Sequence, residues 1–510
     1  MMGLKTVQPK LYLSFSLDSA VPANHLVRRI AAAVDFDFVR GLVHRRYSHT
    51  GQPSVDPVVL FKLWLLGYFF NIMSERRLCE EAGLNLAWRW FLGYELDEAI
   101  PDHSVWSKAR RRFGVKTYEK FFARIVQLCE RAGLVQGDVL FVDSTLTKAN
   151  ASPYGLRSRS LLQQQQLSRP QDFVHDLWVV NDQPDEAPAG DEGEATVEKL
   201  KRGPGRPRGR DRRRSAINEF SLSPVDPDAQ TFVKPGRTPI LGHKTHFLVD
   251  GGKATIITAV EVRGACEADG QAVGVLLDKH RGVLSRAARE LVGDRGYGSE
   301  TALRMCVERE VQPLLGIRAS TNPHGGLNRS AFTYVAERDR YICPQGKELT
   351  RSHENIARRQ TVYKPVRGTC RGCPLRAQCA PGPTDRVITR RWDADIVEEM
   401  QARFSTPRVR ALLRRRQAVS ERINADAKEK HGFAKAQFRG RAKMQIQALL
   451  TAATLNLKQL AGRRPEPQAG IAALAAHLLG SIGSAVHRIG RLHQIAASTT
   501  PSALLPAPIR

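Results

Sequence analysis

The order of regular elements between residues 137 and 317 constrains the fold more than any other feature of the chain. The apolar run VLFV at 139–142 is typical of a strand buried on both faces, and Asp143 follows it at once. The later segments are a hairpin at 242–264, a helix at 267–290, a short strand that ends at Asp294, and a strand at 311–317. This order predicts a mixed α/β sheet.

A helical region is predicted before that sheet, because residues 22–135 repeat apolar side chains at helical spacing. Trp88, Trp90 and Trp106 are expected to lie in its core. The apolar stretch at 58–73 is interrupted by polar residues and is shorter than the roughly 20 residues that span a bilayer. It is therefore predicted to be a buried helix, with no membrane partner.

A long helix is predicted near the C-terminus. Thr406 suits its N-cap, Pro407 its first turn and Gly432 its exit. Arg414, Glu421 and Lys428 are spaced seven residues apart and therefore share one face of this helix. The segment RVRALLRRR at 408–416 holds five arginines, which favours phosphate contacts over a plain solvated face.

The net charge points to a polyanionic partner. The chain has 78 Lys and Arg residues against 51 Asp and Glu residues, a formal net charge of +27. The segment MMGLKTVQPK lacks the features of a signal peptide, which predicts a cytoplasmic location. There the eight cysteines are expected to be free or bound to metal. Nucleic acid is the leading candidate partner.

A long polar insertion separates the first strand from the hairpin. Residues 156–216 are rich in charge and are expected to be largely disordered. Within them GPGRPRGR resembles an AT-hook, in which Arg206 and Arg208 would enter the minor groove, although a flexible basic linker fits equally well. The last residues, 463–510, are expected to form a weakly ordered tail.

Four cysteines lie close together in a region at 318–405 that is expected to be loop-rich. Cys370 and Cys373 form a Cys-x2-Cys pair beside glycine and proline, which is typical of a zinc knuckle. With Cys343 and Cys379 they predict a structural Zn²⁺ site; the alternative is four reduced thiols in a poorly cored insert.

Three acids are candidates for a catalytic site, and each also has an ordinary structural interpretation. Asp143 could cap a turn, Asp294 could form an Asx-turn before Gly296, and Glu421 could be a surface charge. Converging carboxylates are what Mg²⁺ requires, and two such ions can promote phosphodiester cleavage. Composition and periodicity do not join these three residues.

Other histidines and acids are weaker candidates. His243 and His246 are three residues apart on a strand and therefore face opposite sides, which disfavours a shared metal. Asp226, Asp228 and Asp250 are rivals for the second catalytic acid, and the first two lie beside prolines and are interpreted as turn residues.

The acids are joined by a resemblance. VDSTLTKAN around Asp143, GDRGYGS around Asp294 and SERINADAKEKHGFAKAQFRG around Glu421 together resemble a DDE-type insertion-sequence transposase with an RNase H-like core. Over residues 15–462 the chain is most similar to the insertion sequence 1182 family. The resemblance implies that Asp143, Asp294 and Glu421 bind Mg²⁺ or Mn²⁺, and that Lys428 is the lysine that follows the glutamate.

The chain departs from the family signature at two positions. Arg414 stands where the family has tyrosine, and Gln417 stands where it has arginine. This leaves the expected metal ligands unchanged but puts the grip on the DNA end in doubt. Arg414 and Arg416 are still expected to reach phosphates, and Tyr297 is expected to pack or to orient its neighbours and not to act as a nucleophile.

The resemblance implies a transposase that binds terminal inverted repeats and target DNA as double strands, as a homodimer in the synaptic complex, and that cleaves and joins strands in the nucleoid. The alternatives are a non-cleaving DNA-binding regulator and a general metal-dependent nuclease. The expected domains are an N-terminal helical DNA-binding domain (1–135), the first core strand (136–155), the charged insertion (156–216), the continued core (217–317), the Cys-rich insertion (318–405), the catalytic helices (406–462) and the tail (463–510).

Overall fold

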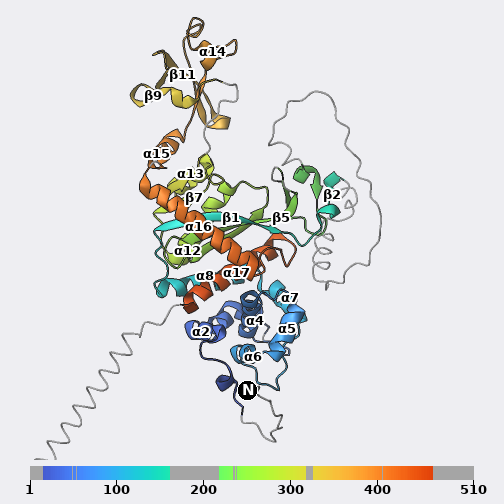
Figure 1. The fold of residues 1–510 in the computed structure, drawn as a ribbon. Coiled ribbons are helices and arrows are strands. Elements are labelled where there is room, and N and C mark those ends of the chain that lie inside the picture. The colour runs from blue at the N-terminus through green and yellow to red at the C-terminus, as the bar shows by residue number, and fades with distance from the viewer. Residues whose placement is uncertain are drawn as a thin grey trace, which may run out of the picture. The chain divides into compact units, whose positions relative to one another are not determined.

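The computed structural model describes residues 15–48, 50–52, 54–160, 217–233, 236, 238–317, 326–404 and 406–462 (Figure 1). The structure therefore does not describe the tail or most of the charged insertion, where disorder and the AT-hook residues Arg206 and Arg208 are predicted. The start of the insertion is described: the short strand β2 (Arg157–Ser158) pairs with β3 (Ser221–Leu222).

The N-terminal region is helical, as predicted. Its α-helices are α1 (Leu17–Ala20), α2 (Leu26–Ala33), α3 (Phe38–Val43), α4 (Pro57–Phe70), α5 (Glu75–Leu84), α6 (Leu86–Leu92), α7 (Ser104–Phe113) and α8 (Val115–Arg131). Nearly all of α4 is buried, and the ring of Phe61 lies 4.6 Å from that of Phe121. Trp88 and Trp106 are buried as expected. Trp90 is only partly buried and lies under the Arg28 guanidinium, 4.4 Å away, so its core assignment is wrong.

No single helix among the described residues is long and apolar enough to cross a membrane. Helices α4 and α5 together have the length and apolar composition of a membrane span, but they meet at a bend of 96°.

The central sheet is mixed, as predicted. Its strands are β1 (Val139–Lys148), β4 (Gln230–Phe232), β5 (Ile240–Asp250), β6 (Ile257–Gly264), β7 (Glu290–Gly293) and β8 (Gln312–Leu315). The order is β4-β5-β1-β7-β8, and β6 also pairs with β5. β5 and β6 form the expected antiparallel hairpin, and β1, β7 and β8 run parallel to one another.

Different helices pack against the central sheet. Leu140, Val142 and Leu291 belong to a buried cluster with residues of α12 (Val273–Leu284), α13 (Glu300–Val307) and α15 (Ala394–Phe404). The long helix α16 (Pro407–Lys430) contacts β1 and β7. Thr406 caps it by accepting a hydrogen bond from the backbone of Val409, as the sequence predicts. α17 (Arg441–Gly462) contacts β6 through Asn456, which accepts a hydrogen bond from the backbone N–H of Ile257 and donates one to its carbonyl oxygen.

The cysteine-bearing region is a sheet and not the loop-rich segment expected. Five antiparallel strands lie in the order β13-β12-β11-β10-β9, with bounds β9 (Thr333–Val335), β10 (Arg340–Ile342), β11 (Glu348–Asn355), β12 (Gln360–Lys364) and β13 (Ile388–Arg391). We call residues 333–391 the five-stranded module. Its strands are short, and the longest of them, β11, is mostly exposed, so their alternation is too weak to be recognised in the sequence.

Candidate active site

Strand register brings Asp143 and Asp294 side by side. β1 and β7 are parallel neighbours, and their pairing ends at Phe141 opposite Val292. Two further residues along each strand reach Asp143 and Asp294, and both project to the face opposite Leu140 and Leu291 because side chains alternate. Parallel pairing of β1 and β7 therefore brings the two acids to the same face of the sheet.

Asp143 lies within its strand and not at its end. β1 continues to Lys148, so the expectation that Asp143 terminates the strand is wrong. Its side chain is 23% exposed and faces α16. Asn424 donates a hydrogen bond from Nδ2 to Oδ2 of Asp143 (3.1 Å), and Arg416 approaches Oδ1 from Nη1 (3.4 Å). Two donors from one helix thus fix the carboxylate.

Arg416 was expected to contact DNA phosphate, but the structure directs it at Asp143. Its side chain is 13% exposed, and its Nε is buried without a hydrogen-bond partner among the described residues. Asn424 was not predicted at all. Only its spacing from Arg416, eight residues or about two helical turns, could have placed both on one face.

Asp294 forms the Asx-turn that was weighed as its structural interpretation. It follows β7 directly, and its Oδ1 accepts a hydrogen bond from the backbone N–H of Gly296 (2.8 Å). The turn and a functional role are compatible, because the N–H holds the carboxylate beside Asp143. Gly298 permits close backbone packing, because a Cβ there would lie 1.8 Å from the carbonyl oxygen of Gly316.

A third carboxylate, Asp269, lies next to Asp294 and was missed. A Cβ added to Gly296 would lie 2.6 Å from Oδ2 of Asp269 and 3.0 Å from Oδ1 of Asp294, so the glycine keeps the space between them open. Lys244 forms an ion pair with Oδ1 of Asp269 (2.9 Å). The available signal was the position of Asp269 just before α12, at the same end of the sheet. We call Asp143, Asp269 and Asp294 the carboxylate cluster.

The charges of this cluster act on one another. Burial raises the pKa of Asp143, Arg416 opposes that rise, and Asp294 and Asp269 add to it. The same three acids, together with burial, raise the pKa of Tyr297 well above its usual value. Tyr297 is fully buried and bonds His246 (Oη to Nδ1, 2.7 Å), whose own pKa burial lowers to about 3. The Tyr297 and His246 side chains are therefore both neutral at physiological pH, and they are buried next to the carboxylate cluster.

Glu421 does not join the carboxylate cluster. Its side chain is exposed and accepts a hydrogen bond from Gln417 (2.9 Å) on its own helix. It lies three residues before Asn424, which turns it about 60° around the helix axis from the side chain that reaches Asp143. Within the described residues no group of three or more His, Cys, Asp or Glu side chains is arranged to hold a metal ion.

The rival acids and histidines have structural partners. His243 and Asp226 form a buried pair (Nε2 to Oδ2, 3.0 Å), and Asp226 also accepts from the backbone of Gly440 (3.1 Å). Asp226 is therefore a fold-linking residue and not a simple turn residue. Asp250 accepts from the backbone of Gln136, Gly137 and Gly252 in a loop. His243 and His246 do face different partners, as predicted.

The other predicted contacts are dispersed. Arg414 is exposed and Lys428 half-buried on α16, on the side of Glu421. A cavity of about 390 Å³ lies at the opposite end of the parallel strands, beside Val139 and Glu290, and none of the carboxylate cluster lines it. Cys343, Cys370, Cys373 and Cys379 all line a second cavity, in the five-stranded module.

Two segments of the chain match transposase family models. The model described as "Transposase domain (DUF772)" matches residues 15–112, and the model described as "Transposase DDE domain" matches residues 342–461. The first runs from α1 into α7, and the second begins at the last residue of β10, covers β11 to β13 of the five-stranded module, and includes Glu421 and Lys428. No curated protein and no solved structure matches the chain.

The fold and these matches define a class: a mixed α/β protein with an RNase H-like core, which the DDE domain implies, and an N-terminal helical region. Within that class the two matches support a DDE transposase of an insertion sequence.

Proposed function

We propose that this protein is a DNA transposase, closest to the insertion sequence 1182 family, that binds terminal inverted repeats and carries out phosphodiester hydrolysis and strand transfer. The observation that carries the proposal is the placement of Asp143 and Asp294 at matching positions on adjacent parallel strands. The two acids share a register and a face of the sheet, and the charge of Asp294 raises the pKa of Asp143. Carboxylates that perturb one another in this way are common at functional sites.

The residues present fit a divalent cation such as Mg²⁺ or Mn²⁺. Mg²⁺ is commonly held by one or two carboxylates, with waters and substrate phosphates completing its shell, and Asp143 and Asp294 provide two. Such ions supply a lowered pKa for an attacking hydroxyl and stabilisation of the leaving oxygen. Glu421, the third acid that the resemblance implies, would supply a further oxygen ligand from α16.

The protein's own groups would prepare this site in stages. Asn424 and the backbone of Gly296 hold Asp143 and Asp294 in fixed orientations. Arg416 offsets the charge of Asp143, and its guanidinium would offer a donor for a DNA phosphate beside that carboxylate. Tyr297 is fully buried, so we assign the attack to water and then to a 3′-hydroxyl, with no covalent enzyme intermediate.

The partner is double-stranded DNA, both the element ends and the target. The charge of +27 supports it, because phosphate neutralisation dominates affinity for DNA. Recognition of the ends is assigned to the N-terminal helices, and phosphate contacts to Arg414 and Lys428, within a homodimeric synaptic complex. We place the protein in the cytoplasm, at the nucleoid.

The test is cleavage of a supercoiled plasmid that carries the gene with its flanking DNA, in the presence of Mg²⁺. Wild type is expected to nick at the element ends, Asp294→Ala to lose nicking, and Asp138→Asn, an exposed acid outside the cluster, to retain it. Equal, minimal nicking by wild type and Asp294→Ala under conditions of end binding would instead indicate a non-cleaving regulator. Cutting that scrambled end DNA competes away would indicate a general nuclease.

A further inference from the structure

The five-stranded module has too little apolar core for its size. Its strands span 59 residues from Thr333 to Arg391, and its buried cluster consists of five side chains: Phe332, Tyr341, Leu349, Tyr363 and Ile388. Domains of this size commonly need a disulfide, a metal or another cross-link to be stable. Cys343 and Cys379 pack against this cluster, so the cysteines lie where a cross-link would act.

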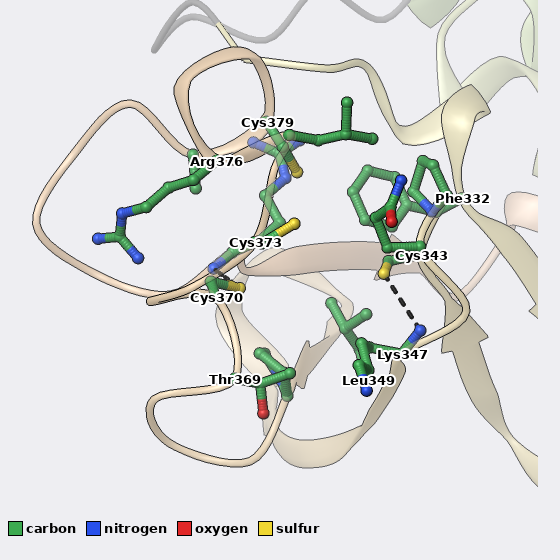
Figure 2. Close-up of a pocket in the computed structure, with 15 residues that line it drawn as sticks. Phe332, Cys343, Lys347, Leu349, Thr369, Cys370, Cys373, Arg376 and Cys379 are labelled. Carbon is green, nitrogen blue, oxygen red and sulfur yellow. Dashed lines mark hydrogen bonds between the residues drawn. The ribbon is translucent and has the colours of Figure 1, made fainter.

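All four cysteines of the module line one small cavity. Cys343 follows β10, Cys370 and Cys373 lie in the loop after β12, and Cys379 ends the short helix α14 (Arg376–Cys379). The cavity is about 30 Å³, close to the space of a single water molecule. Figure 2 shows the four sulfur atoms around the same space between the loop and the sheet. We call it the thiol cavity.

The backbone around the thiol cavity already donates to sulfur. The N–H of Lys347 points at Sγ of Cys343 (3.3 Å), and the N–H of Arg386 points at Sγ of Cys370 (3.5 Å). The turn that supplies the first of these closes at Gly346, which has a φ of +72° that other residues rarely adopt. Backbone donors of this kind stabilise a thiolate far more than a neutral thiol.

One positive charge acts on the cavity. Arg386 lines it, its Nε is buried with no hydrogen-bond partner among the described residues, and its charge opposes the rise that burial causes in the pKa of Cys379. The Arg376 guanidinium points away and donates to the carbonyls of Gly382 and Pro383 (Figure 2). Four thiolates around one divalent cation carry a net charge of −2, which Arg386 would partly offset.

We propose that the thiol cavity is a structural zinc site in which Cys343, Cys370, Cys373 and Cys379 bind one Zn²⁺ as a tetrathiolate. Four ligands and no open position define a structural site and not a catalytic one. As they stand, the described side chains contain no group of three arranged as metal ligands. Binding therefore requires the cysteine side chains to rotate toward a common centre, releasing four thiol protons to solvent.

The site would act as the missing cross-link of the module. It would join the end of β10, the loop after β12 and the end of α14. This role is independent of the proposed metal at the carboxylate cluster, which takes oxygen ligands and not sulfur.

The test is metal analysis of the purified full-length chain by mass spectrometry, with no zinc added. Wild type is expected to carry about one zinc per chain. Cys370→Ser with Cys373→Ser should lose it, and Cys79→Ser, a cysteine outside the module, should keep it. Because the double variant could fail for lack of folding, Cys373→His provides the second arm: it should retain zinc, since three cysteines and one histidine also form tetrahedral sites.

The outcomes separate cleanly. Wild-type protein without zinc, equal zinc in the double variant and in Cys79→Ser, or loss of zinc in Cys373→His as complete as in the serine variant would overturn the proposal. Disulfides among the four cysteines, detected by alkylation before and after reduction, would overturn it in favour of a covalent cross-link. None of these readouts depends on DNA cleavage, so the proposed transposase activity can fail while the zinc site stands.

Discussion

The six-stranded sheet around Asp143 and the five-stranded module around Leu349 place polar ligand groups on very different amounts of apolar core. The carboxylate cluster lies beside the inner strands β1 and β7 of a sheet whose residues pack into a large buried cluster with α12, α13 and α15. The thiol cavity lies over five buried side chains. The large core of the sheet offsets the cost of holding carboxylates close together, whereas the five-stranded module would draw stability from the proposed zinc.

The largest effect is expected at Glu421, the predicted ligand that lies outside the carboxylate cluster. Glu421→Gln should lower the cleavage rate by about 10³-fold, because a carboxylate that binds the metals is worth several kcal/mol in the transition state. Glu429→Gln, an exposed glutamate on the same helix, should have no effect. A rate near that of wild type would show that the carboxylate cluster works without the helix acid, with Asp269 as the third ligand.

The difference in core size is tested by a matched pair of truncations. Leu349→Ala and Leu291→Ala each remove a buried leucine, 2% and 1% exposed, and each should cost about 3 kcal/mol. In the small module this loss should open residues 333–391 to limited proteolysis, whereas Leu291→Ala should lower the global melting temperature and leave the sheet protected. Equal protection of the module in both variants would contradict the comparison.

A smaller effect is expected at Asn424, which positions Asp143. Asn424→Ala removes one hydrogen bond to a charged group, worth about 1.5 kcal/mol, and should reduce cleavage by about tenfold. The effect should appear in kcat with end binding unchanged, since Asn424 contacts the carboxylate and not the DNA. Unchanged kcat would show that Arg416 alone orients Asp143.

DNA contact by the outer face of α16 predicts a change in salt dependence. Lys428→Gln should lower the slope of log affinity against log salt by about one ion. Lys430→Gln is the control, because Lys430 lies about 200° around the helix axis from Lys428 and so on another side of α16. An identical change in both variants would mean that DNA affinity depends on the total charge of α16 and not on a contact made by Lys428.

The smallest effect is expected for the thermal stability of a variant at Asp143, which should rise while its cleavage activity is lost. Because burial raises the pKa of Asp143, its protonated form favours the fold; that contribution is present below the ordinary value of 3.8 and is lost as pH rises through the raised pKa. Asp143→Asn should therefore melt slightly higher than wild type at pH 7 while losing cleavage. The gain should shrink near pH 4, and thermal unfolding at the two pH values measures it; a lower melting temperature at pH 7 would contradict this.

Much of the fold follows from local sequence. The β5 and β6 hairpin, the strand at β8 and the capped helix α16 were predicted because turn residues, alternation and Thr406 act within a few residues of the chain. The five-stranded module was missed because its strands are short and the longest, β11, is mostly exposed and shows no alternation. Resemblance, and not periodicity, joined the three acids.

What the sequence determined by itself was the identity of the strands, the caps and the charged residues, because these depend on neighbours along the chain. Only the tertiary structure decided that Asp143 and Asp294 share a register, that Asp269 lies beside them, that Asn424 and not Glu421 faces Asp143, and that four cysteines border one cavity. The physical reason is that each of these relations depends on strand pairing or helix rotation between segments far apart in the chain, which no local pattern encodes.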